Sequence, residues 1–148
     1  MGFDRETSVG YVANHLARLL EKNLAQAIRP LGLTPGQFPV LLALWERDGL
    51  TQKALVGLTD VEQATMANTL ARMERDGLIR READPQDNRS RLVFLTERAR
   101  TLETEATVVA DAINARACEG LSAAEREQML DAMRRLIANL TANAEPAR

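Results

Sequence analysis

The change of pattern at residues 78–95 constrains the fold more than any other feature of the sequence. Elsewhere the apolar residues recur at helical spacing, but Leu78-Ile79 and the run Leu92–Leu95 are short groups of branched and aromatic side chains that favour strands. Residues 83–90, which lie between them, are rich in turn formers. The pattern predicts a β-hairpin with a long polar tip inside a mostly α-helical chain of 148 residues.

Helices are predicted on both sides of the hairpin from apolar spacing and capping signals. Thr34-Pro35-Gly36-Gln37 begins one helix, Asp60 is expected to cap another, and Ser122 with Glu125 forms a capping box for the last. The expected helical ranges are 7–30, 34–48, 52–58, 61–76, 96–119 and 122–139. A short helix, a tight turn, a second helix and a hairpin, in that order, outline a winged helix-turn-helix.

The chain length fits one domain with helical extensions. We expect a winged helix-turn-helix lobe over residues 34–95, flanked by dimerisation helices over 1–33 and 96–143, with a disordered tail at 144–148. Two long terminal helices with apolar stripes cannot bury those faces on a small lobe alone, so a homodimer is expected.

The helix expected over 61–76 has two different faces. Met66, Leu70 and Met73 fall within a narrow arc of the helical wheel and are expected to face the core. The opposite arc carries hydrogen-bonding and cationic side chains, namely Thr65, Asn68, Arg72 and Arg75. Asn pairs with adenine and Arg with guanine in the major groove of DNA, and Gln63 and Thr65 lie in the first turn, which enters the groove. Taken alone, this wheel favours a solvated surface helix.

Charge is unevenly distributed along the chain, whose net charge is −2. Residues 78–100 carry six arginines against four acidic residues, whereas residues 101–148 carry five basic residues against eight acidic ones. The total charge argues against a protein that coats nucleic acid, but the local excess places positive charge where a wing would touch DNA. The alternative is an ordinary charged surface hairpin, because Arg–Asp pairs often only solvate a loop.

The sequence lacks the residues that several classes of function require. Cys118 is the only cysteine and His15 the only histidine, so one chain offers neither a disulfide framework nor a two-histidine metal site. No phosphate-binding glycine loop and no nucleophile elbow occur, so we expect no enzyme, no metal and no cofactor. Without an apolar span or a secretory signal, a cytoplasmic protein with no membrane partner is expected. Cys118 is expected to be a small buried thiol rather than a redox sensor.

The stretches 51–55, 61–66 and 70–81, followed by Asp84-Pro85-x-Asp87-x-Arg89 and Leu95-Thr96-Glu97, resemble the MarR family of transcriptional regulators. The similarity spans residues 34–99 and is closest to the SlyA-type branch. It implies a ligand-responsive repressor that binds double-stranded DNA as a homodimer at a pseudo-palindromic operator. It also implies that the helix at 61–76 is the recognition helix and that Arg89 enters the minor groove. The family's usual Asp-Arg-Arg is Asp87-Asn88-Arg89 here, which predicts one phosphate contact fewer.

The expected DNA contacts form three sets. They are Gln63, Thr65, Asn68, Thr69 and Arg72 on the recognition helix, Asp87, Arg89 and Arg91 in the wing, and Gln52, Lys53 and Arg75 at the phosphates. The alternative function is that of a dimeric helical adaptor whose hairpin binds another protein.

Tyr11, His15 and Arg18 form a polar and aromatic stripe on the first helix. The resemblance implies a site for small aromatic acids where the lobe meets the dimerisation helices, and Phe38 and Trp45 are expected to line it with them. A cation, an imidazole and aromatic rings suit a carboxylate or a phenolate effector. The alternative is a solvated face with Trp45 in the core, and the sequence favours neither.

Overall fold

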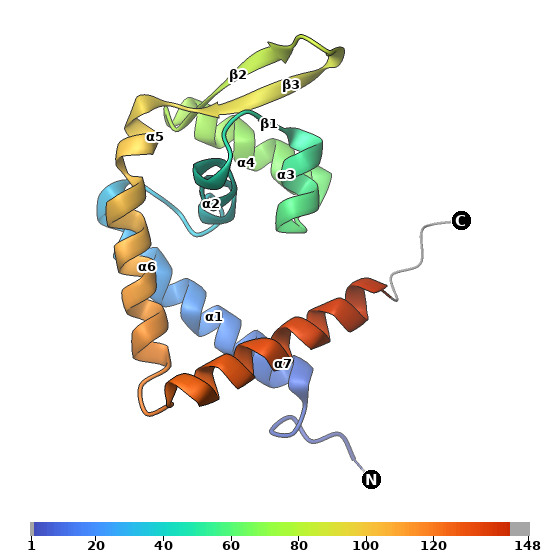
Figure 1. The fold of residues 1–148 in the computed structure, drawn as a ribbon, viewed down its shortest axis with the longest axis vertical. Helices are drawn as coiled ribbons and strands as arrows, with labels where there is room; N and C mark the ends of the chain where they lie inside the picture. Colours follow the sequence, from blue (N-terminus) through green and yellow to red (C-terminus); the bar gives the residue numbers. More distant parts are fainter. Residues whose placement is uncertain (1, 143–148) are drawn as a thin grey trace. The chain divides into compact units, whose positions relative to one another are not determined.

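The computed structural model describes residues 2–142 (Figure 1). Its elements are α1 (Val9–Ile28), the 3-10 helix η1 (Arg29–Leu31), α2 (Phe38–Glu46), β1 (Leu50–Thr51), α3 (Gln52–Thr59), α4 (Gln63–Arg75), β2 (Ile79–Asp84), β3 (Asp87–Leu95), α5 (Glu97–Thr101), α6 (Glu103–Ala117) and α7 (Ala123–Ala142). The predicted fold class, mostly helical with a β-hairpin, is confirmed. The tail predicted at 144–148 lies outside the described residues.

The described chain divides into two compact units. The first runs to Ile113 and contains the lobe with α1, α5 and most of α6, and the second begins at Asn114 and contains α7. Within the second unit, the predicted capping box is present: Ser122 N–H donates to Oε1 of Glu125 at 3.0 Å, and Glu125 N–H donates to Oγ of Ser122 at 3.1 Å. In the part of the chain that is described, no helix is both long and apolar enough to cross a membrane.

The core of the first unit draws on every layer of the lobe. The predicted core face of α4 is confirmed, because Met66, Leu70 and Met73 are completely buried. They pack in one cluster with Leu41 and Leu44 of α2, Leu55 of α3, Val93 and Leu95 of β3, and Ile28 at the end of α1. Burial of each such side chain stabilises the fold by roughly 1.5–3 kcal/mol. The core therefore fixes which face of α4 remains outside.

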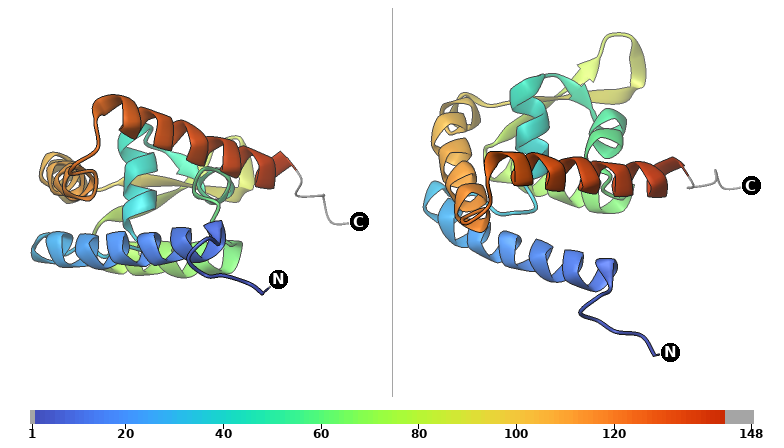
Figure 2. Two further views of the ribbon diagram at one scale, coloured as in Figure 1. Left: turned by 90° about the horizontal axis from the view of Figure 1, so that it is seen from below. Right: turned by 60° about the horizontal axis from the view of Figure 1, so that its bottom comes forward.

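The sheet has three antiparallel strands in the order β1-β3-β2. β1 was not predicted, because its two residues are too few to show a strand pattern; Leu50 pairs with Val93. The hairpin tip is shorter than the predicted one, since Asp84 already pairs with Asp87 and only residues 85 and 86 form the turn. A register shift next to Asp84 accompanies this turn. Figures 1 and 2 show the hairpin running out past α3 to its tip.

The turn between α3 and α4 differs from the prediction that Asp60 caps α4. Asp60 instead ends α3: its φ of 54° is left-handed, and its N–H donates to the carbonyl of Val56. A residue in that conformation closes the C-terminus of a helix. The residue before α4 is Glu62, whose side chain makes no capping hydrogen bond, and Gln63 is the first residue of α4 rather than a capping-box partner.

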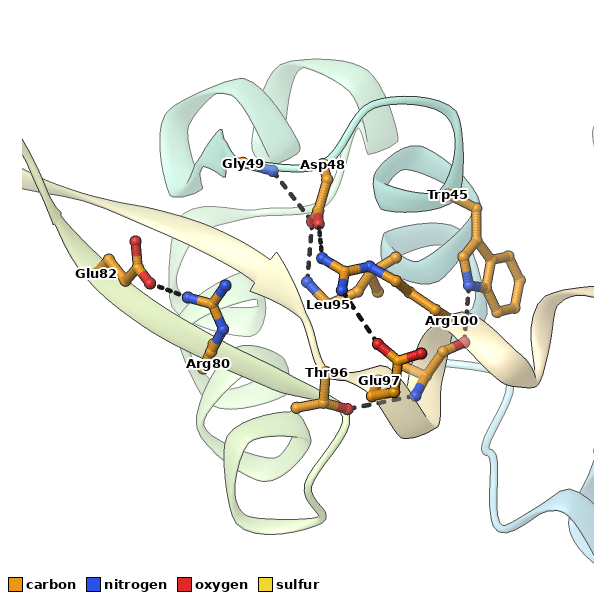
Figure 3. A network of polar contacts seen from close by, with 10 residues as sticks. Trp45, Asp48, Gly49, Arg80, Glu82, Leu95, Thr96, Glu97 and Arg100 are labelled. Carbon is orange, nitrogen blue, oxygen red and sulfur yellow. Dashed lines mark hydrogen bonds and ion pairs between the residues drawn. The ribbon is translucent and has the colours of Figure 1, made fainter.

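Asp48 ties three segments of the lobe together, as Figure 3 shows. Its Oδ1 accepts hydrogen bonds from the N–H groups of Gly49 at 3.1 Å and Leu95 at 2.9 Å, and its Oδ2 pairs with Arg100 of α5 at 2.8 Å. The hydrogen bond to Asp48 raises the pKa of the Arg100 guanidinium. Close by, Nε1 of Trp45 donates to the Ala99 carbonyl at 3.0 Å. The end of the wing and α5 are thus joined by polar contacts.

The single helix predicted over 96–119 is divided in two. α5 ends at Thr101 and α6 begins at Glu103, with Leu102 between them. Thr96 opens α5, because its side chain accepts the Ala99 N–H. Apolar spacing alone did not show this break, because Leu102 and Ala106 continue the same helical stripe across it.

Candidate nucleic-acid interface

The outer face of α4 carries the predicted recognition residues. Gln63, Thr65, Asn68 and Arg72 are exposed, and Thr69 is half-buried. The hydroxyl of Thr69 donates to the Thr65 carbonyl at 2.8 Å, so this side chain is held against the helix. A helix of this width fits the major groove of B-DNA, where amide and guanidinium groups reach base edges. The core contacts on the other face leave Thr65, Asn68 and Arg72 together on one surface, whereas Gln63, seven residues before the buried Leu70, lies in the first turn beside α3 and the hairpin.

Both ends of α4 suit an anionic partner, for different reasons. The first turn begins without a side-chain cap, so its amide groups are available to a phosphate oxygen. Arg72 and Arg75 lie in the last turn, where their positive charge interacts favourably with the negative end of the helix dipole and is available to attract phosphate. Gly77 then ends the helix as predicted, with a φ of 74°.

A hollow of about 440 Å³ lies between α3, α4 and the hairpin. Its lining brings together residues from all three predicted contact sets, which are Gln52, Lys53, Gln63, Asp87, Arg89 and Arg91, and it adds Arg81, Ser90, Leu70 and Val93. Four of these side chains are cationic and one is acidic, so the hollow is positive overall. Its size and charge suit a segment of sugar-phosphate backbone.

Arg81 is the one charged residue of this hollow that was not among the predicted DNA contacts. Its Nε is buried without a hydrogen-bond partner among the described residues, and it lies 3.7 Å from Oε2 of Glu74. Arg81 pairs across the sheet with the buried Val93, so both belong to the covered face of the hairpin. The spacing of two residues from Ile79 on the same strand was the available signal, because such residues share a face.

A second hollow, of about 310 Å³, lies between α4 and the turn that precedes α2. It is lined by Thr34, Gly36, Gln37, Thr69, Arg72, Arg75 and Asp76. Arg75 also pairs with Asp76, from Nε to Oδ1 at 3.3 Å. The first hollow borders α4 on the side of α3 and the hairpin, and the second borders it on the side of the turn before α2. A helix in the major groove is bounded by two phosphate backbones, so this arrangement matches that environment.

The wing tip is ordered by its aspartates rather than by ion pairs. Oδ1 of Asp87 accepts the Arg89 N–H at 2.9 Å, and Oδ1 of Asp84 accepts the Gln86 N–H at 2.9 Å. Nη2 of Arg91 donates to the Arg81 carbonyl at 3.3 Å. Between residues 2 and 142, no ion pair involves Arg89, whose exposed guanidinium is available to a ligand. Such an arginine suits the narrow, negative minor groove.

The residues of the expected effector site fall into two groups. Phe38 is buried and meets the ring of Trp45 edge to face, with ring centroids 6.1 Å apart. Tyr11, His15 and Arg18 are exposed on α1, and the guanidinium of Arg5 lies 6.0 Å from the Tyr11 ring. The pocket that would join the two groups stays a prediction. Among residues 2–142, no group of three or more His, Cys, Asp or Glu side chains is arranged to hold a metal ion.

Comparison with known proteins gives consistent matches. The model of the MarR family matches residues 33–90. The transcriptional regulator HosA of Escherichia coli is 33% identical over 125 residues, which cover 84% of this chain and 93% of HosA. An HTH-type transcriptional repressor of Mycobacterium tuberculosis is 30% identical over 128 residues, which cover 86% of this chain and 92% of the repressor.

The whole fold is also similar to that of a solved structure. The solved structure of the transcriptional regulator SlyA has a TM-score of 0.87 with this chain at 26% identity, covering 93% of this chain and 96% of SlyA. The three proteins are described as regulators or repressors of transcription, and none is described as an adaptor.

Proposed function

The chain belongs to the MarR family, and we propose that it regulates transcription by reading duplex DNA with α4 and the β2–β3 hairpin. The observation that carries this proposal is the polar and cationic face of α4, bordered by two hollows that hold arginines. In this assignment Gln63, Thr65 and Asn68 read base edges in the major groove. Arg89 enters the minor groove, and Lys53 contacts phosphate.

The protein acts as a repressor in the cytoplasm by occupying a promoter. This direction of regulation is supported by the similarity to a mycobacterial transcriptional repressor. A small net charge of −2 limits attraction to random DNA, because that attraction depends on the number of phosphates neutralised. Site selection therefore depends on a few arginines and polar side chains of the lobe.

A homodimer is the assembly that we propose. α1 exposes an apolar stripe on which Val9 is 63% exposed, Val12 49% and Leu19 47%. On α7, Ile137 is 64% and Leu140 79% exposed. Apolar faces of this kind are buried by a second copy in symmetric oligomers. Light scattering at micromolar concentration is expected to give the mass of two chains, and the mass of one chain would contradict the assembly.

An aromatic acid or phenol is the proposed effector, bound by Tyr11, His15 and Arg18 together with Phe38 and Trp45. Such a ligand lowers DNA affinity only if it prefers a conformation that does not bind DNA. Trp45 is the sole tryptophan of the sequence, so its fluorescence reports on the site. Titration with phenolic acids should change both this fluorescence and the DNA affinity. Unchanged values of both would contradict the effector site.

The DNA-binding proposal is tested by selecting bound duplexes from a random pool and measuring their affinities by mobility shift. The DNA upstream of the protein's own gene is the natural second probe. We expect a pseudo-palindromic consensus and an affinity that falls steeply with salt concentration, because phosphate contacts release counterions. A pool that shows no enrichment, together with no shift of the upstream DNA at low salt, would contradict the proposal.

A further inference from the structure

The C-terminal end of α4 is held by side chains from the turn before α2 and from the start of α5. Nε2 of Gln37, which is itself buried, donates to Oδ2 of Asp76 at 3.2 Å. Oγ1 of Thr96 donates to the Gly77 carbonyl at 2.7 Å. Nη1 of Arg98, from α5, donates to the Asp76 carbonyl. These contacts converge on the two residues that close the recognition helix.

Arg98 reaches a further segment from the same position. Its Nη2 lies 3.0 Å from the place that a Cβ on Gly32 would occupy, and Gly32 ends η1 with a φ of 77°. Its Nη1 lies 3.9 Å from the corresponding place on Gly77. The guanidinium therefore sits between the end of α1–η1 and the end of α4. The planar fork of arginine allows its two terminal nitrogens to face two segments at once.

We propose that Arg98 is a positioning residue for DNA recognition, which fixes the angle of α4 relative to α5 and to the end of α1. The other end of α4 has no side-chain cap, since Glu62 makes no capping hydrogen bond, and it is held by the packing of Met66 alone among the residues of its first turn. The inference rests on the proposed function, because it assigns the orientation of the helix that reads the bases. Nothing about it requires Arg98 to touch DNA.

Because α4 is long, a small change in its tilt at the C-terminal end displaces its first turn by a larger distance. Its 13 residues span roughly 20 Å at a rise of about 1.5 Å per residue. A tilt of about 10° around the anchored end displaces the first turn by roughly 3 Å, which is the length of a hydrogen bond. Gln63 and Thr65, in that first turn, would lose their base contacts before the residues near Arg75 moved appreciably.

The test compares two duplexes, the selected one and a version with substituted base pairs under the first turn of α4. The discrimination ratio is the affinity for the first divided by that for the second, both measured at one salt concentration. For Arg98→Lys and Arg98→Gln we expect this ratio to fall about tenfold, the size of one lost base contact. Arg98→Lys retains the charge, so its affinity for the substituted duplex should equal that of the wild type.

Arg100→Gln is the matched control, because Arg100 lies on the same helix and pairs with Asp48 rather than with α4. It removes the same charge and should keep the wild-type ratio. Circular dichroism verifies that each variant is folded at the temperature of the titration. Wild-type ratios in both Arg98 variants would overturn the proposal, as would an equal loss in Arg100→Gln. A wild-type protein that bound both duplexes equally would overturn the proposed function itself, and this inference with it.

Discussion

At the scale of single residues, backbone conformation decides where the helices of the lobe end. Asp60 adopts the left-handed conformation at a φ of 54°, which makes it the end of α3 and delays the start of α4 to Gln63. The sequence suggested an N-cap, because Asp serves both purposes and its identity does not reveal the sign of φ. The end of α4 at Gly77 was predicted correctly, because glycine is the residue that most often adopts the left-handed conformation after a helix.

Asp60 should respond to substitution according to that conformation. Asp60→Val is expected to destabilise the protein by about 1–2 kcal/mol, because a branched side chain is strained at positive φ. Asp60→Gly should leave the free energy of unfolding about unchanged, since relief of strain offsets the flexibility that glycine adds to the unfolded chain. Urea unfolding measures both.

The control for Asp60 lies inside a helix. Ala71 is exposed on α4, so Ala71→Gly should cost roughly 1 kcal/mol. A larger loss for Asp60→Gly than for Ala71→Gly would contradict the role of the left-handed turn.

Asn68 and Arg89 should affect DNA binding in different ways. Asn68→Ala is expected to relax base choice at one position of each half-site, at a cost of roughly 1–3 kcal/mol. Arg89→Ala should weaken binding to all duplexes alike and lower the dependence on salt, because it removes a backbone or minor-groove charge. Affinities for a panel of duplexes at several salt concentrations separate the two. Arg126→Ala, on α7, is the control for the loss of one charge, and identical behaviour of Asn68→Ala and Arg89→Ala would contradict the division of roles.

At the scale of elements, apolar spacing and capping signals predicted the long helices to within about four residues, with α2 beginning at Phe38 rather than at Thr34. Branched and aromatic groups predicted the hairpin, but β3 begins at Asp87 rather than at Leu92. The helical spacing had two further failures. It missed β1, which has two residues, and the break at Leu102, where the apolar stripe continues unchanged. The exposed face of α4 that we propose for recognition followed from the wheel, because Met66 and Leu70 had to be buried. Arg81 and the second hollow did not follow, because they depend on how β2 and the turn before α2 pack against α4.

The start of α7 should depend on pH through its capping box. The backbone N–H of Ser122, and secondarily its side chain, lower the pKa of the Glu125 carboxyl. The carboxylate therefore stabilises the helix fully above the pKa of Glu in the unfolded chain. This stabilisation is lost as the pH falls through the lower pKa of the folded protein.

Glu125→Gln is the variant that isolates this effect. The wild type should melt at a higher temperature than Glu125→Gln at neutral pH, and the difference should vanish in acid. Melting followed by circular dichroism across the pH range measures it. A difference that stayed constant with pH would contradict the assignment to Glu125.

At the scale of the whole molecule, an acidic chain carries a locally basic segment at the proposed DNA-binding surface. Residues 78–100 have a net charge of +2 and residues 101–148 have one of −3, so the acidity is concentrated in the predicted dimerisation helices. Arg81, Arg89 and Arg91 of the basic segment line the first hollow beside α4, and Arg72 and Arg75 of α4 itself line the second. This distribution favours a regulator that holds random DNA weakly and depends on matched contacts at its site.

The most direct test of this account is a hydroxyl-radical footprint of the protein on its selected duplex. Two symmetric copies of the lobe place their recognition helices about one DNA turn apart, roughly 34 Å. The account predicts two protected segments with that separation, and minor-groove protection beside them that disappears with Arg89→Ala. One protected segment alone, or minor-groove protection that survives the loss of Arg89, would contradict it.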